Sequence, residues 1–280
     1  MPKTKRIKTI EAGQLREIVI YTPPTRYDTQ QQRAQRSKAT TRAQAAMNLK
    51  NRRKRLEFII AGNFGPQDRF ITLTYDDEHL PATRKEARAN VPRYLAQLRE
   101  LRRRFGLQFK YVYGTEGIHG ESRLHHHIII TAAPGDLEQL QSLWPYGNVD
   151  IETLGKYGSD RCAILAAYIL KERKPNGEQG YTNSKNIDPP RITAEWIDED
   201  CALTAPRGAV ILEEGKEIQP FSEYYHLKYL RPDNAGRKEK IDNGATAPMG
   251  LVTHNNFRKE DREKRAGPLS KNLSCSSIKA

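Results

Sequence analysis

Three consecutive histidines open an apolar run in the segment YGTEGIHGESRLHHHIIIT, residues 113–131. Side chains of a β-strand alternate between its two faces, so His125 and His127 would point to one side and His126 to the other. Two imidazoles spaced two residues apart can bind one metal ion, and the middle imidazole cannot join them. The spacing therefore predicts that His125 and His127 form a pair of metal ligands.

A carboxylate lies within reach of this pair. Glu116 precedes His125 by nine residues and ends the strand-like run QFKYVYGTE. Antiparallel pairing of the two runs would return the carboxylate to the face of His125 and His127. Two imidazoles and one carboxylate suit a divalent cation with open positions, and the hard oxygen ligand favours Mg²⁺ or Mn²⁺. Zinc joined by His119, or ordinary hydrogen-bonded histidines, are the competing interpretations.

A second reactive group lies farther along the chain, in the helix-forming run SDRCAILAAYILKE. Tyr168 and Lys171 are three residues apart in this run and would share one face of the helix. A tyrosine can act as a nucleophile when a neighbouring cation favours its phenolate. Taken alone, Tyr168 is more simply interpreted as a core aromatic.

The elements that would position these groups alternate in type. RFITLTYDD predicts a strand, residues 91–105 an amphipathic helix, and the two runs above a hairpin. PGDLEQLQSLW predicts a helix, YGNVDIETL a strand and SDRCAILAAYILKE a further helix. This order predicts an α+β fold, in which helices pack on one face of a mainly antiparallel central sheet.

Three stretches, FITLTYDDEHLP, LHHHIII and AAYILKE, resemble the motifs of rolling-circle replication initiators of the HUH endonuclease superfamily. The resemblance is greatest to the replication-associated proteins of single-stranded DNA phages and related plasmids, and it covers about residues 65–190. It implies an HUH-type nicking domain that cuts single-stranded DNA at a replication origin through a covalent 5′-phosphotyrosine.

Residue by residue, the resemblance implies three metal ligands, a nucleophile and its helper: Glu116, His125 and His127, then Tyr168 and Lys171. Two departures from the family pattern are visible. His126 occupies a middle position that is usually a hydrophobe or aromatic residue. The motif also holds one tyrosine, whereas some phage relatives have two, and this affects how strand transfer is completed.

The charge of the chain points to the same class of partner. Of the 280 residues 47 are Lys or Arg and 34 are Asp or Glu, and residues 1–55 hold 15 of these cations but only 3 of the acids. Such a concentrated positive field favours a polyanion, although single basic residues are often only a solvated face. The candidate DNA contacts are Arg52, Arg53, Lys54, Arg55, Arg102, Arg103, Arg104, Lys171, Arg173 and Lys174, with Tyr113 or Tyr146 stacking an unpaired base.

Other sequence features indicate the cellular compartment and the partners. No stretch approaches the roughly 20 apolar residues of a membrane span, and three separated cysteines without a CxxC pair suggest a reducing compartment. We therefore expect the cytoplasm of a bacterial host. Because no GxxxxGK[ST] loop occurs, the host helicase and DNA polymerase are the expected partners.

These patterns predict that the chain is divided into four segments. Residues 1–60 form a basic N-terminal arm with a helix over 29–58, and residues 65–190 form the nicking domain. Residues 191–232 are an accessory extension with short strands and a SEYYHLKYL run compatible with a helix, and residues 233–280 are a polar tail predicted to be disordered. A single-tyrosine transposase or relaxase, or a non-catalytic basic DNA-binding protein with a structural metal, remain the alternative functions.

Overall fold

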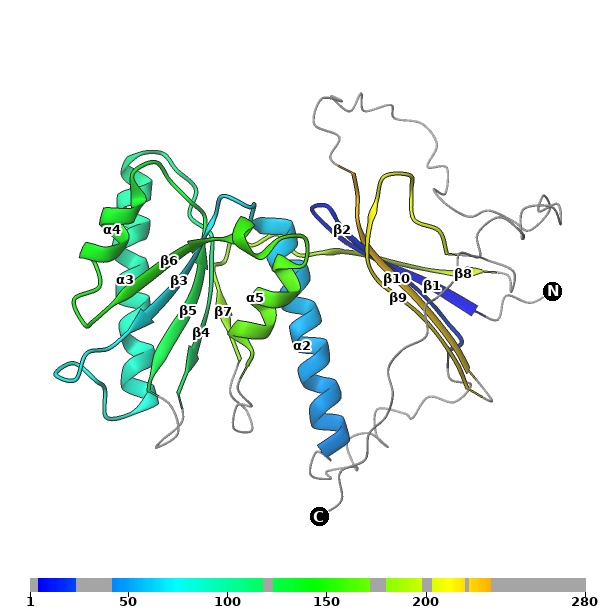
Figure 1. Cartoon of the computed structure of the whole chain (residues 1–280), viewed down its shortest axis with the longest axis horizontal. Helices are drawn as coiled ribbons and strands as arrows, with labels where there is room; N and C mark the ends of the chain where they lie inside the picture. The colour runs from blue at the N-terminus through cyan, green and yellow to red at the C-terminus, as the bar shows by residue number, and fades with distance from the viewer. Residues whose placement is uncertain are drawn as a thin grey trace, which may run out of the picture.

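The computed structural model describes residues 5–23, 42–117, 123–171, 180–197, 203–219 and 222–232. Within these ranges the protein contains two five-stranded antiparallel sheets and the helices between and around them (Figure 1). The predicted α+β class is therefore confirmed. The expected tail (233–280), and residues 29–41 of the expected basic helix, lie outside the described residues.

The first sheet has the strand order β6-β3-β5-β4-β7. Its strands are β3 (Arg69–Thr74), β4 (Tyr111–Glu116), β5 (His125–Ile130), β6 (Val149–Thr153) and β7 (Thr182–Asn183). Every neighbouring pair in it is antiparallel. The histidine strand β5 is central, with β3 on one side and β4 on the other.

Helices cover both faces of this sheet, not the single face that the sequence suggests (Figure 1). The alternating side chains of β3 and β5 explain this. Ile71 and Ile128 pack on one side with α3 (Arg84–Arg104) and α4 (Asp136–Ser142). Phe70 and Ile129 pack on the other side with α2 (Arg42–Asn63) and α5 (Arg161–Ile169). Both faces are apolar, so both need a cover. A short 3₁₀ turn, η1 (Leu154–Tyr157), leads from β6 toward α5.

Helix α3 shows how local sequence sets the edges of this core. Thr83 caps its start, because its hydroxyl accepts the Glu86 amide at 3.2 Å, and the Glu86 carboxylate accepts the Ala82 amide. The helix begins seven residues before the expected start at 91, since this capping pair precedes the apolar pattern. Its apolar face then packs on the sheet as predicted.

The second sheet has the order β8-β1-β2-β10-β9 and joins the two ends of the described chain. Its strands are β1 (Lys5–Ala12), β2 (Leu15–Tyr21), β8 (Arg191–Ile197), β9 (Val210–Gln219) and β10 (Ser222–Leu230). The described start of the expected N-terminal arm is thus a hairpin. The SEYYHLKYL run is strand β10, not a helix, because it pairs along its length with β2.

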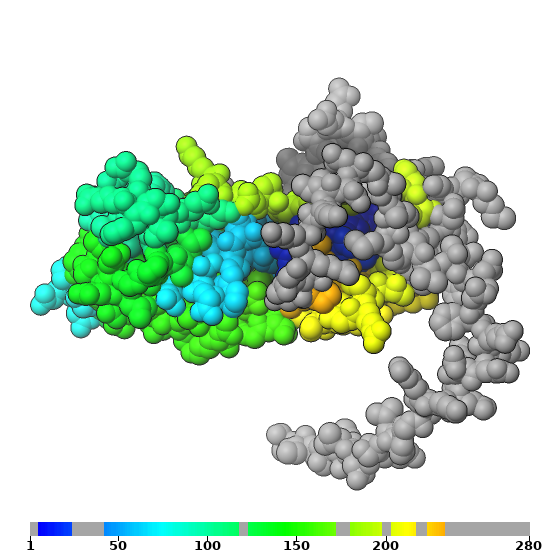
Figure 2. All heavy atoms as spheres, turned by 90° about the horizontal axis from the view of Figure 1, so that it is seen from above, coloured from blue at the N-terminus to red at the C-terminus, as the bar shows by residue number. Residues whose placement is uncertain are grey.

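Helix α2 lies between the two sheets (Figure 1). The view from above shows the part built on the first sheet beside the part built on the second (Figure 2). Its C-terminal half packs in both directions. Leu56 and Ile60 join the core beneath α5, whereas Phe58 packs against Ile10 and Leu15 of the second sheet. No helix in the described part of the chain is long and apolar enough to cross a membrane.

Phe58 tests whether α2 holds the second sheet in place. Phe58→Ala removes a fully buried ring, and we expect the free energy of unfolding to fall by about 3–5 kcal/mol. The matched control, Met47→Ala, truncates an exposed side chain of the same helix and should change it by less than about 0.5 kcal/mol. Chemical denaturation measures both, and equal effects would show that Phe58 is not an anchor.

Candidate active site

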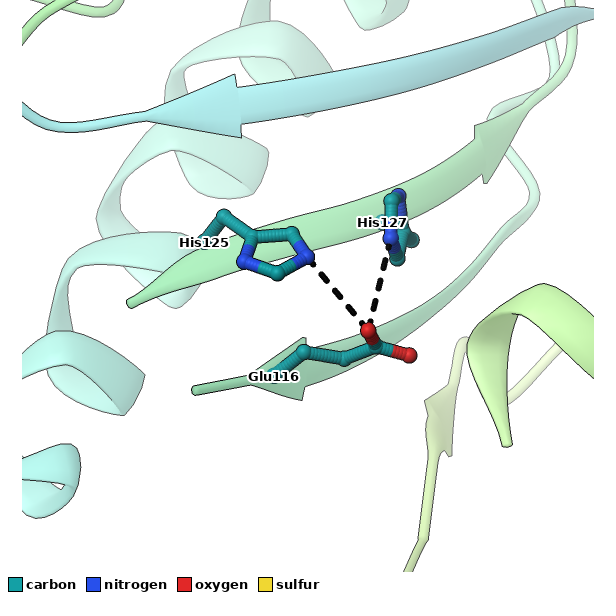
Figure 3. A group of neighbouring side chains, drawn as sticks. All are labelled: Glu116, His125 and His127. Atoms are coloured by element: carbon teal, nitrogen blue, oxygen red, sulfur yellow. Dashed lines mark ion pairs between the residues drawn. The ribbon is translucent and has the colours of Figure 1, made fainter. Parts of the chain in front are cut away.

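The three predicted ligands meet at the end of the β4–β5 pair. In this register Glu116 lies opposite His125, and Gly114 lies opposite His127. The Nε2 atoms of His125 and His127 lie 3.4 Å and 3.7 Å from Oε2 of Glu116 (Figure 3). One donor atom from each of the three residues lies within 4.8 Å of the others. The group is therefore compact enough to surround one cation.

The other ring nitrogens hold the two imidazoles in position. Nδ1 of His125 lies 2.8 Å from the carbonyl oxygen of Arg123, and Nδ1 of His127 lies 3.2 Å from the Thr72 hydroxyl. A carbonyl can only accept, so Nδ1 of His125 donates to it, and this bond turns Nε2 toward Glu116. Such outer contacts orient the ligands of metal sites.

His126 points to the opposite face, as strand alternation predicts. It is fully buried, with Nε2 at 2.9 Å from the Tyr75 hydroxyl and Nδ1 at 2.9 Å from the Thr115 hydroxyl. Burial raises the pKa of Tyr75 to about 12, so its hydroxyl stays neutral. His126 is therefore a hydrogen-bonded part of the core beneath α3.

Glu116 is a buried carboxylate. Burial alone would raise its pKa, but hydrogen bonds to His125 and His127 and the charge of both rings lower the pKa to about 2. Its other oxygen, Oε1, is buried and has no hydrogen-bond partner among the described residues. An ionised carboxylate with an unused oxygen beside two imidazoles is a donor set that fits a divalent cation. His119, the extra ligand of the zinc interpretation, lies outside the described residues.

A glycine lets the tyrosine helix approach this site. A Cβ atom at Gly114 would lie 2.9 Å from both the carbonyl oxygen and Cγ2 of Ile169, at the end of α5. Any side chain at position 114 would push α5 away from β4. This role is not among the sequence predictions, although the glycine in YGTE is a visible signal for a close backbone approach.

Tyr168 lies on α5 beside the cluster. Its ring centroid is 6.2 Å from that of His127, and its side chain is 45% exposed. Tyr157 and Phe70 support the ring, with centroids at 6.3 Å and 6.1 Å. Because nearly half of Tyr168 is open to solvent, it is not the core aromatic of the alternative interpretation. Lys171 follows the helix, is exposed, and donates its amide to the Tyr168 carbonyl.

Arg53 of α2 holds the end of the tyrosine helix. Its Nε and Nη2 donate to the carbonyl oxygen of Leu170 at 3.3 Å and 3.0 Å. A cation at a helix C-terminus satisfies an otherwise unpaired carbonyl and the negative end of the helix dipole. The sequence predicts Arg53 as a DNA contact, and the structure shows it bound to this carbonyl.

The other basic residues predicted to contact DNA differ in their exposure to solvent. The prediction that Arg102 contacts DNA is wrong, because Arg102 is buried. Its guanidinium contacts Asp136 at 3.3 Å and so stabilises the core. Arg103 and Arg104 are exposed and pair with Glu100. On α2, Lys54 is partly buried and contacts Glu17 at 2.6 Å, whereas Arg52 and Arg55 are exposed.

The last four candidates for DNA contact lie in different settings. Arg173 and Lys174 lie outside the described residues. Tyr113 is buried in the core beneath α3 and is not available to stack a base. Tyr146 is partly buried, with its ring centroid 4.9 Å from that of Trp144.

Comparison with known proteins gives two matches. Residues 68–173 match the family described as Replication-associated protein ORF2/G2P. Replication-associated protein VP4 of Bdellovibrio phage phiMH2K is 26% identical over 191 residues, and the match covers 58% of each chain. The aligned region is thus little more than half of that relative. No solved structure matches the chain. The matched segment contains the whole cluster and Tyr168, as the resemblance in the sequence predicts.

Metal binding can be tested without any activity. A cation that binds only the folded protein raises its midpoint of thermal unfolding. We expect Mn²⁺ to raise this midpoint in the wild type and to have no effect on His127→Ala. His79→Ala is the control, because His79 is an exposed histidine paired with Asp76 on another loop, and this variant should keep the response. A full response in His127→Ala would exclude this site.

Hydrogen exchange tests the contact between Arg53 and α5. Arg53→Met removes both bonds to the Leu170 carbonyl, so the amides in the last turn of α5 should exchange faster, on the order of tenfold. Arg52→Met, at the exposed neighbouring position, should leave these amides unchanged. Equal protection in the two variants would mean that Arg53 does not hold the helix.

Proposed function

We propose, starting from the match of residues 68–173 to the replication-associated protein ORF2/G2P family, that this protein nicks single-stranded DNA at a replication origin and so initiates rolling-circle replication. One observation carries the proposal. An exposed tyrosine, Tyr168, lies beside a compact group of Glu116, His125 and His127 that can hold a divalent cation. A tyrosine nucleophile beside a bound divalent cation is an arrangement that can cleave a phosphodiester.

Tyr168 is proposed as the nucleophile. The phenol gives up its proton as its oxygen attacks the scissile phosphorus, and the bond from phosphorus to the 3′ oxygen breaks. That oxygen takes up a proton, so no proton is gained or lost overall. The products are a 5′-phosphotyrosine and a free 3′-OH. The exposure of Tyr168 supports this role, since a DNA backbone can reach the ring without displacing the core.

Ionisation of the phenol is the main energetic obstacle. A tyrosine with a reference pKa near 10 costs about 4 kcal/mol to ionise at pH 7. Lys171 is exposed and lies two residues beyond the end of the same helix, and its positive charge would favour the phenolate. Arg53 holds the Leu170 carbonyl, which lies between Tyr168 and Lys171 in the chain, so the segment that carries both groups is held in place.

The ligand group supplies the other half of the chemistry. When Mg²⁺ or Mn²⁺ is bound by Glu116, His125 and His127, it would polarise the scissile phosphate and offset the charge that develops there. The protein residues orient this group: the Thr72 hydroxyl and the Arg123 carbonyl hold the two rings. The burial of Glu116 keeps the carboxylate in one place.

The covalent ester explains why replication could follow. It preserves the energy of the phosphodiester bond, so a second transfer can rejoin DNA ends without ATP. The free 3′-OH is a primer for a DNA polymerase. Because the sequence has no GxxxxGK[ST] loop, the host helicase and polymerase are the proposed partners.

The test is a covalent adduct between the protein and single-stranded DNA. Purified protein with Mn²⁺ and an origin-like oligonucleotide should form a species that survives denaturing electrophoresis. Tyr168→Phe should form none. Tyr157→Phe, which alters the neighbouring tyrosine, should retain it, since burial and the Glu152 carboxylate raise the pKa of Tyr157 and leave it a poor nucleophile. Lys171→Ala should slow formation by about 10- to 100-fold.

The outcomes separate the alternative functions. An adduct that persists in Tyr168→Phe would assign the chemistry to another residue. Absence of any adduct in the wild type, with every divalent metal, would favour a non-catalytic DNA-binding protein. A transposase or relaxase would also form the adduct, and the similarity to replication-associated proteins is what favours replication.

A further inference from the structure

A row of four side chains crosses the second sheet. In the strand register, Arg6 lies opposite Trp196 on one side and Tyr21 on the other, and Tyr21 lies opposite Tyr224. Directly opposed residues of antiparallel strands share one face of the sheet. Strands β8, β1, β2 and β10 therefore carry, in this order, Trp196, Arg6, Tyr21 and Tyr224, which we call the aromatic row.

The aromatic row is open to solvent at both ends. Trp196 is 50% exposed and Tyr224 is 37% exposed. Between them, the guanidinium carbon of Arg6 lies 5.3 Å from the centroid of the Trp196 ring. Large aromatic rings on an exposed sheet face provide flat surfaces for another ring to stack on.

This face is also the one that packs on α2. Ile10 contacts Phe58 near one end of the strands. Beyond this contact the sheet and α2 leave a groove of about 410 Å³, whose lining includes Lys8, Tyr21 and Tyr224 from the sheet and Lys54 from the helix. The aromatic row thus supplies part of the lining of the groove through Tyr21 and Tyr224, and α2 supplies another part through Lys54.

The charge around the groove is positive. Residues 42–55 of α2 contain six Lys or Arg and no Asp or Glu, and of these six Lys54 lines the groove. The carboxylates near the groove are already paired: Glu223 contacts Lys5 at 2.9 Å, and Glu17 contacts Lys54 at 2.6 Å. Lys8 shares the face of Arg6 and adds a cation. Aromatic rings beside an excess of cations fit a polyanion with free base faces.

We infer that this groove binds a stretch of unpaired DNA, separate from the strand at Tyr168. Bases would stack on Tyr21 and Tyr224 in the groove and on Trp196 at the other end of the aromatic row, and phosphates would lie along Lys8 and α2. Duplex DNA does not fit, because its base faces are already stacked on each other. The choice of DNA as the ligand rests on the proposed function.

The position of α2 connects the two DNA sites. Arg53 reaches the end of the tyrosine helix, and the next residue, Lys54, reaches Glu17 of the second sheet. The groove and Tyr168 therefore lie on two sides of one basic helix. A strand held in the groove can cross α2 to the nicking site, so the groove would hold DNA that flanks the cleavage point.

The test compares two neighbouring tyrosines in the full-length chain carrying Tyr168→Phe, so that no covalent complex forms. Fluorescence anisotropy with a labelled oligothymidine measures affinity without base pairing. Trp196→Ala and Tyr224→Ala should each raise Kd by roughly 5- to 100-fold. Tyr225→Ala, whose side chain lies on the opposite face of β10, should change it by less than about twofold. Equal effects at positions 224 and 225, or no effect of Trp196→Ala, would overturn the inference.

Intrinsic fluorescence gives a second measurement. The chain has two tryptophans, and Trp144 is buried in the core between the first sheet and α3. Because a base can stack on Trp196 and not on Trp144, an oligonucleotide should quench the fluorescence of Trp196. Trp196→Phe keeps a ring for stacking, and it should retain most of the affinity but lose the quenching. Quenching that persists in this variant would overturn the inference.

Two further outcomes separate the groove from a dimer interface and from the nicking site. If Trp196→Ala changes the mass in sedimentation and leaves the affinity for DNA intact, the face binds a second copy of the chain and the inference is wrong. Failure of the wild type to form the covalent adduct would overturn the proposed function alone, because the affinity measurements use an inactive variant and need no cleavage. An intact adduct without any effect of the aromatic row would overturn this inference alone.

Discussion

The antiparallel pairing of β4 and β5 is the constraint on which the rest of the site depends. It places Glu116 opposite His125, and it places Gly114 opposite His127. The first pair completes the ligand group. The second removes a side chain at the point where α5 meets the sheet, which admits Tyr168 to the same face. A slip of one residue would turn His126 outward and bury both ligands under α3.

The opposite face keeps this register in place. His126 is bonded through both ring nitrogens, to the hydroxyls of Tyr75 and Thr115, and it lies in an apolar core. A buried imidazole that lost these partners would be costly, since a buried polar group needs its hydrogen bonds. The third histidine of the sequence thus serves the site indirectly, by holding the strand that carries the two ligands.

Helix α2 connects the reactive part of the protein to the second sheet. Its adjacent residues Arg53 and Lys54 point to different partners, the end of α5 and a carboxylate of β2. On the second sheet side, Lys228 of β10 contacts the buried Glu57 of the same helix at 3.1 Å. Burial is the main influence on the Glu57 carboxyl and raises its pKa, although Lys228 opposes this. Two residues of the basic run in the sequence, Arg53 and Lys54, therefore hold elements of the fold together.

The sequence by itself determined what depends on local spacing. Strand alternation separated His125 and His127 from His126, and hairpin pairing added Glu116, both without knowledge of distant contacts. The helical spacing predicted for Tyr168 and Lys171 does not hold, because α5 ends at Ile169. Only the tertiary structure decided what depends on partners far away in the chain. SEYYHLKYL is a strand because it lies between β9, which directly precedes it, and β2, which lies some 200 residues earlier in the chain. Likewise, Arg102 forms a buried ion pair with Asp136, and Arg53 donates hydrogen bonds to the Leu170 carbonyl. The sequence around a basic residue looks the same whether the side chain contacts DNA, a buried carboxylate or the end of a helix. Only the folded chain shows which of these partners lies next to it.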